Sequence, residues 1–209
     1  MEDNIFELRR NEDDGKEGIF AISLVEEPAI EEDAVYFSKE DDTYNFQIDE
    51  ERGMMTGPIM IPGKKIPRPS KKKTVFFSKE GIEEEIYNLS AVPFTLNHGK
   101  NEAGKPDFVD GVKLAEKWVI EDSMDKAYGR GFDPEKLPIG TGMITAKFLD
   151  PANNPLWKKV KEQAIKGFSL EGRFANEEVE ATEEHSVNAE ISEIIEDYTN
   201  HKNTLKNGN

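Results

Sequence analysis

The residues best suited to chemistry are a serine flanked by glycines and a histidine well upstream of it. Ser169 lies in the run Gly167-Phe-Ser-Leu-Glu-Gly-Arg-Phe174, and His98 lies in the sequence Asn97-His98-Gly99. A serine hydroxyl attacks a carbonyl only when a base, usually a neutral imidazole, removes its proton. The two segments together therefore predict nucleophilic acyl transfer at Ser169, with backbone amides near the flanking glycines, Gly167 or Gly172, binding the oxyanion.

The chain has three histidines, and their surroundings in the sequence decide which one suits the role of base. His98 is the last residue of an apolar segment and is followed by Gly99. The strand expected there would hold the histidine rigidly, and the glycine would leave one side of it accessible. His185 lies in an acidic stretch, and His201 lies near a polar end of the chain. Position therefore favours His98 as the base.

A catalytic histidine is itself oriented by a third group. Residues i and i+2 of a strand share a face, so Ser169 and Glu171 are expected to point the same way. Glu171 is therefore the preferred acid, while Glu116 and His185 stay open as alternatives. Ordinary structural roles also fit these residues, because Ser-x-Glu-Gly is a weak motif and Glu171 can pair with a surface cation.

Short apolar runs bounded by turn residues predict about eight strands and two or three short helices. The clearest helix follows Ser78, a good N-cap, and runs over 79–89; a second lies within 150–163. The strand candidates are 18–25, 35–37, 44–48, 54–61, 74–77, 94–98, 112–120, 142–149 and 168–174. Because strands outnumber helices without regular alternation, we expect a β-rich α+β domain, barrel-like, with a few short surrounding helices.

The charge pattern divides the chain into three parts. Residues 1–17 are charged and predict a flexible N-terminal segment, and 18–175 hold the core-forming runs. Residues 176–209 are expected to form an acidic linker and a short amphipathic helix with apolar residues at helical spacing.

Two prolines restrict one of the strand candidates. Pro58 and Pro62 confine the run 54–61 to an edge strand or a bulge.

Composition narrows the classes of function. The 209 residues carry a formal charge of −16, which argues against general nucleic-acid binding because phosphate contacts need clustered Lys and Arg. There is no cysteine, which excludes disulfides, thiolate metal sites and a cysteine nucleophile. No apolar run approaches the roughly 18 residues of a spanning helix, and the acidic start lacks a signal peptide's features. We expect a protein with no membrane or nucleic-acid partner that stays where it is made.

A series of segments in the same order resembles the XkdF-type phage serine proteases, a branch of the prohead or capsid maturation proteases. The segments cover roughly residues 18–175 and are 18–30, 57–62, 75–80, 97–99, 118–122 and 165–174. Proteases of this kind are similar to the herpesvirus assembly proteases, with a β-barrel ringed by helices. The resemblance implies Ser169 as nucleophile and His98 as base, on neighbouring strands, with no cofactor or metal.

One departure from this family concerns the third catalytic residue. Related proteases carry a strand of the type Glu-Val-Ser-Leu-Val-x-x-Pro-Ala after the nucleophile, whereas here the similar run 22–29 is N-terminal and Ala21 stands at the acid's place. This predicts a circularly permuted barrel whose N-terminal strand pairs beside the catalytic strand. The third residue therefore does not transfer from the family.

The resemblance implies a prohead endopeptidase that cleaves segments of the phage scaffold protein and the major capsid protein, followed by self-cleavage. Its place is the host cytoplasm, inside the assembling prohead, and self-association stays open. The alternative is a catalytically inactive protein of the same fold that acts as scaffold or internal component of the head. An unrelated β-rich binding domain is a third interpretation.

Overall fold

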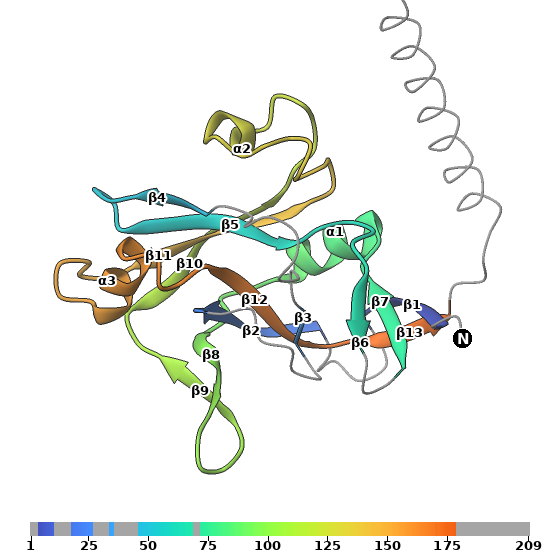
Figure 1. The fold of residues 1–209 in the computed structure, drawn as a ribbon, viewed down its shortest axis with the longest axis horizontal. Helices are drawn as coiled ribbons and strands as arrows, with labels where there is room; N and C mark the ends of the chain where they lie inside the picture. The colour runs from blue at the N-terminus through green and yellow to red at the C-terminus, as the bar shows by residue number, and fades with distance from the viewer. Residues whose placement is uncertain (1–3, 11–17, 27–33, 36–45, 69–71, 179–209) are drawn as a thin grey trace, which may run out of the picture. The chain divides into compact units, whose positions relative to one another are not determined.

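Figure 1 shows the protein in a computed structural model, which describes residues 4–10, 18–26, 34–35, 46–68 and 72–178. Contacts divide the chain into two units, Met1–Glu177 and Glu178–Asn209. The described residues form three sheets and three short helices, and all that follows concerns the first unit. The helix expected in the C-terminal segment lies outside the described residues.

A five-stranded sheet carries the candidate catalytic residues. Its strands, in spatial order, are β3 (Ala34–Val35), β12 (Gly167–Arg173), β2 (Gly18–Val25), β8 (Phe94–Lys100) and β9 (Pro106–Val109). β12 runs antiparallel to β2, and β2 runs parallel to β8. Strand β2 therefore does pair beside the strand that holds Ser169, as expected. Because β2 lies between Ser169 and His98, the expectation that nucleophile and base are on neighbouring strands is wrong.

A second sheet packs its apolar side chains against the first. Its strands, in spatial order, are β10 (Val112–Val119), β11 (Gly142–Phe148), β5 (Met54–Met60) and β4 (Gln47–Asp49). Pro58 is accommodated within β5 because the pairing with β4 ends before it and the ladder to β11 is irregular beside it. The bulge expected from this proline is therefore present, although β5 is an interior strand.

Three of the four strands in the third sheet lie outside the strand segments predicted from the sequence. Its strands, in spatial order, are β13 (Ala175–Glu178), β1 (Asn4–Arg9), β7 (Lys73–Phe76) and β6 (Ile66–Arg68). Part of the N-terminal segment expected to be flexible is thus β1, paired in parallel with β7, with Leu8 buried. The local sequence of β1 is rich in charged residues, and its pairing partner β7 lies far along the chain. A reading of local patterns therefore did not predict this strand.

The helices are short and flank the sheets. They are α1 (Lys79–Asn88), α2 (Lys126–Gly129) and α3 (Pro155–Lys161). α1 begins as predicted, because the Ser78 hydroxyl accepts a hydrogen bond from the Gly81 backbone N–H, 3.0 Å away. α3 begins five residues later than the predicted segment, since Asn154 caps it and Pro155 occupies its first turn.

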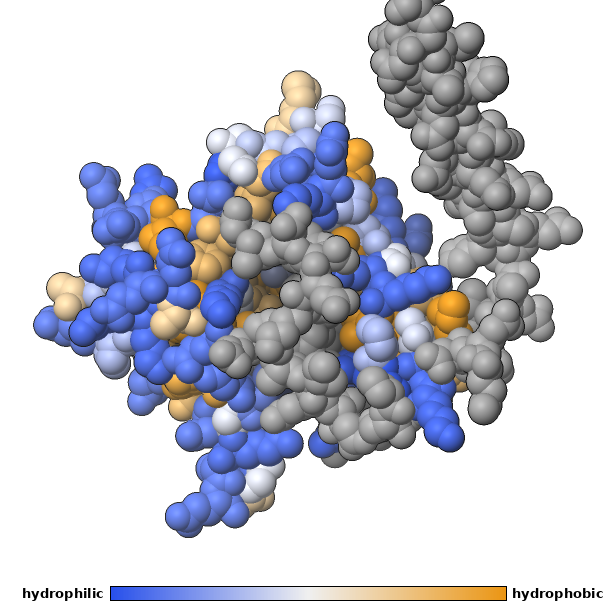
Figure 2. Space-filling view, in the orientation of Figure 1, coloured by the Kyte–Doolittle hydropathy of each residue, from blue (hydrophilic) through white to orange (hydrophobic). Residues whose placement is uncertain are grey.

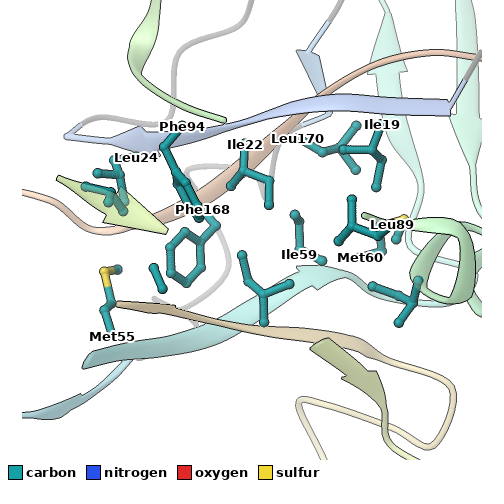
Figure 3. Packing of buried hydrophobic residues seen from close by; sticks show 14 of the residues in the cluster. Ile19, Ile22, Leu24, Met55, Ile59, Met60, Leu89, Phe94, Phe168 and Leu170 are labelled. Carbon is teal, nitrogen blue, oxygen red and sulfur yellow. The ribbon is translucent and has the colours of Figure 1, made fainter. Parts of the chain in front are cut away.

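The main core lies between the five-stranded sheet and β5. Figure 3 shows side chains from β2, β8 and β12 meeting those of β5, with Leu89 beside them. The labelled residues are Ile19, Ile22, Leu24, Phe94, Phe168, Leu170, Met55, Ile59, Met60 and Leu89. Burial of this apolar surface fixes which face of β12 points inward.

The structure confirms a β-rich α+β fold but corrects the expectation of a barrel. Over the described residues the strands form three sheets, and no closed barrel is formed. Closure depends on pairings between distant strands, which short apolar runs do not encode.

Figure 2 shows the molecule in the orientation of Figure 1. The described part of the surface seen there is mainly hydrophilic, with apolar residues scattered singly.

Candidate functional site

Alternation along β12 separates its core residues from its polar residues. Phe168 and Leu170 point into the core (Figure 3), so Ser169 and Glu171 lie on the opposite face of the sheet. Both polar side chains are nevertheless buried, at 2% and 8% exposure. The same-face arrangement expected for the nucleophile and the acid is therefore present.

Three hydroxyl groups lie in a row across this face. Ser169 on β12 is opposite Ser23 on β2, and Ser23 is opposite Thr95 on β8. All three side chains are buried. Each alternates with core residues of its own strand, which places the row on the face away from the core.

His98 reaches this face through an unusual backbone conformation. A regular β8 would place His98 on the side of Phe94 and Leu96, which contact the core. Instead, Asn97 and His98 both adopt the left-handed region, with φ of 50° and 53°. Two consecutive non-glycine residues in this region are uncommon and cost free energy, a feature that concentrates at functional sites.

The contacts of His98 show which face it occupies. Its backbone N–H donates to the Ser23 hydroxyl, 2.9 Å away, and its Nδ1 lies 3.4 Å from Oε1 of Glu171. The left-handed residues thus bring the imidazole to the face that carries Ser169. Opposite faces would have excluded acid–base chemistry between these two residues.

Glu171 reaches across β2 to the strand that holds His98. β12 and β8 are about 10 Å apart, two strand spacings, with β2 between them. The residue of β2 opposite Glu171 is Ala21, whose small side chain leaves room above it. The Thr95 hydroxyl donates a hydrogen bond to the same carboxylate oxygen that faces His98. The carboxylate is therefore held from two sides.

The charge of Glu171 is maintained despite its burial. Burial alone raises the pKa of this carboxyl group, but hydrogen bonds from His98 and Thr95, together with electrostatic attraction from the imidazole and from Lys100, outweigh it. The net pKa lies below the ordinary value of 4.5. Glu171 is therefore an anion at neutral pH, as an acid that orients an imidazole must be.

The two glycines proposed as oxyanion donors have different surroundings. A side chain at Gly172 would place its Cβ 2.4 Å from the Phe174 ring, so this glycine serves close packing. At Gly167 no described atom outside its chain neighbours lies within 4 Å of such a Cβ. Of the two, the Gly167 side of Ser169 is the open one.

The alternative third residues lie elsewhere. Glu116 is on β10 in the other sheet, 2.7 Å from Lys126 and 3.2 Å from Arg130, which occupy its carboxylate. His185 and the third histidine, His201, lie outside the described residues. Among the described candidates, only Glu171 contacts His98.

Sequence reasoning missed the residues that support the site. Ser23 and Thr95 each interrupt an apolar strand run, and that interruption was an available signal of a polar face. Asn97 precedes a His-Gly pair and is a residue type that tolerates the left-handed region, which was a weaker signal. Their roles depend on the strand order, which the sequence does not display locally.

The described residues contain no group of three or more His, Asp or Glu side chains suited to holding a metal ion. None of the described helices is long and apolar enough to span a membrane. Comparisons with models of protein families, with curated proteins and with solved structures found no match to this chain. The geometry of Ser169, His98 and Glu171 is therefore the structural evidence that bears on function.

Proposed function

We propose that this chain is a serine endopeptidase that cleaves scaffold and capsid-protein segments during phage head maturation. The observation that carries the proposal is the placement of His98. Its imidazole shares a buried face with Ser169, and its Nδ1 lies 3.4 Å from the Glu171 carboxylate. An uncommon backbone conformation is needed to bring it there. The resemblance to the prohead proteases supplies the substrate class.

In the proposed mechanism, Ser169, His98 and Glu171 act in both half-reactions, acylation of the serine and hydrolysis of the acyl-enzyme. The Ser169 Oγ attacks the scissile carbonyl while Nε2 of His98 accepts its proton, and Glu171 keeps Nδ1–H directed at the carboxylate. Backbone N–H groups beside Gly167 stabilise the oxyanion. His98 then gives its proton to the leaving amine, and water hydrolyses the acyl-enzyme by the same route.

The position of β2 fits the permuted relationship to other prohead proteases, which we include in the proposal. In this arrangement β2 occupies the place of a strand that follows the nucleophile in those enzymes. Its Ala21 does not supply an acid; it leaves space for Glu171 from the neighbouring strand. The acid is thus proposed to come from the nucleophile's own strand.

Burial of the site favours a second candidate function. Ser169 is 2% exposed and His98 is 6% exposed, so a peptide carbonyl reaches the hydroxyl only after neighbouring chain moves. A closed, inactive protease fold that serves as scaffold or internal head component has the same burial without any such movement.

Co-expression separates the two functions. The chain is produced with the scaffold and major capsid proteins of its own phage, as wild type and as Ser169→Ala, and the products are measured by intact mass. The protease predicts fragments with wild type that are absent with the variant. Identical masses in both, with heads still assembling, would contradict the protease and support the structural role.

A further inference from the structure

A side-chain contact in β8, directly after its pairing with β2 ends, fixes the backbone that presents His98. We propose that Asn97 is a positioning residue of the catalytic site, and that it acts through Glu26 to hold His98 on the face of Ser169. This inference rests on the proposed function, because it assigns Asn97 a role in that same reaction. The action of Asn97 and Glu26 on the site is indirect, because it passes through the backbone of His98.

Asn97 and Glu26 form a reciprocal pair of hydrogen bonds. The Asn97 Oδ1 accepts from the Glu26 backbone N–H at 2.8 Å, and its Nδ2 donates to Oε2 of Glu26 at 2.9 Å. Both functional atoms of the amide are therefore engaged by one residue. We call this pair the Asn97–Glu26 clamp.

A third residue holds the clamp in place. Lys159 of α3 lies 2.5 Å from the other carboxylate oxygen, Oε1 of Glu26. The Lys159 and Asn97 hydrogen bonds outweigh the effect of burial and keep the pKa of Glu26 below its ordinary value. The carboxylate thus stays ionised and directed at Asn97 over the neutral pH range. The clamp joins the residue after β2 and the middle of β8 to α3.

The clamp matters because the backbone it holds is unfavourable on its own. The left-handed region is costly for a histidine and less so for an asparagine. Without the side-chain contacts of Asn97, β8 can relax toward regular alternation. His98 would then turn toward the side of Phe94 and Leu96, away from Glu171. The clamp therefore opposes the relaxation that dismantles the site.

Exchanging donor and acceptor across the clamp provides a direct test. Asn97→Asp places two carboxylates against each other, whereas Asn97→Asp with Glu26→Gln restores one donor and one acceptor in reversed order. Reaction of Ser169 with a fluorophosphonate probe, followed by intact mass, gives the maximal rate constant and the apparent affinity separately. We expect Asn97→Asp to lower the rate constant about tenfold with the affinity unchanged, and the double variant to return within about threefold of wild type.

A matched control removes the same chemistry from a pair of residues outside the clamp. Asn153 donates through Nδ2 to Oδ2 of Asp150 at 2.9 Å, in an exposed turn before α3. Asn153→Asp creates an equivalent carboxylate pair, and we expect it to leave the rate constant of Ser169 unchanged. In parallel, the ring signals of His98 in nitrogen-15 NMR should move in Asn97→Asp and return in the double variant.

The outcomes distinguish this inference from the proposed function. If wild type reacts at Ser169 but Asn97→Asp reacts equally fast, or if the double variant fails to recover, Asn97 does not position His98 and the protease stands. If wild type does not react and matches Ser169→Ala, the proposed function is wrong and this inference falls with it.

Discussion

At the scale of single residues, the ionised carboxylate of Glu171 is the feature that links stability to pH. Its pKa in the folded chain is below the ordinary 4.5 because hydrogen bonds from His98 and Thr95 outweigh burial. The unfolded chain therefore takes up this proton first as pH falls. The stability that Glu171 contributes is fully present above about pH 4.5 and is lost as pH falls through the lower, folded-state pKa.

Glu171→Gln removes this contribution. We expect the difference in unfolding free energy between wild type and variant to be constant near neutral pH and to shrink below pH 4.5, the ordinary pKa of the group. Urea unfolding over a pH series measures it. The fluorophosphonate reaction of Ser169 should slow by up to about 10⁴-fold, because the amide no longer stabilises the imidazolium. A difference that grows on acidification would contradict the assigned charge.

At the scale of elements, β12 and β8 cooperate although β2 lies between them. Glu171 passes over Ala21 and meets both Thr95 and His98. Each strand supplies one part: β12 the nucleophile and the acid, β8 the base. Ala21 of β2 leaves room for the Glu171 side chain to cross, and the Ser23 hydroxyl of the same strand accepts a hydrogen bond from the His98 backbone N–H. The site is thus a property of the strand order rather than of any one motif.

Thr95→Val tests this crossing, because it keeps the shape of the side chain and removes its hydroxyl. We expect a loss of about 1–3 kcal/mol in unfolding free energy, since a buried carboxylate loses a donor, and a slower reaction at Ser169. Thr56→Val is the matched control, because Thr56 is also buried and its hydroxyl lies 2.9 Å from that of Thr145 in the other sheet. It should lower stability and leave the reaction of the folded protein unchanged. Equal effects of both variants on the reaction would argue against a role for Thr95.

The sequence predicted the site only where the backbone is regular. Ser169 and Glu171 were placed on one face correctly because β12 alternates without interruption between them. The same rule puts His98 on the core side, and the two left-handed residues within β8, Asn97 and His98, reverse that placement. The contact of Thr95 with Glu171 depends on a strand order set by pairings more than 70 residues apart. Local patterns do not contain that information.

At the scale of the whole described unit, a partly buried ion pair joins elements from separate parts of the fold. Glu85 of α1 is 2% exposed, lies 3.0 Å from Arg10 after β1, and accepts a hydrogen bond from the Ile19 backbone N–H of β2. The Arg10 guanidinium packs closely against Gly18: a Cβ at this position would lie 2.2 Å from it. Gly18 has a φ of 102°, which favours glycine there as well. The strand that carries Ala21 and Ser23 is thus fixed at its start by α1.

Glu85→Gln should therefore destabilise the fold without altering the site. We expect a loss of about 1–3 kcal/mol in unfolding free energy, because a partly buried ion pair loses one charge while the Ile19 contact can persist. Glu83→Gln on the same helix is the control: its pair with Lys79 is exposed and 4.0 Å long, so about 0.5 kcal/mol or less is expected. Urea unfolding should give a lower midpoint for Glu85→Gln with an unchanged slope, which marks a change in stability alone. Since Glu85 contacts β2 at its start, before the residues of the catalytic face, the reaction of Ser169 per folded molecule should equal that of wild type in both variants. A slower reaction in Glu85→Gln would instead mean that α1 transmits its position to the catalytic face.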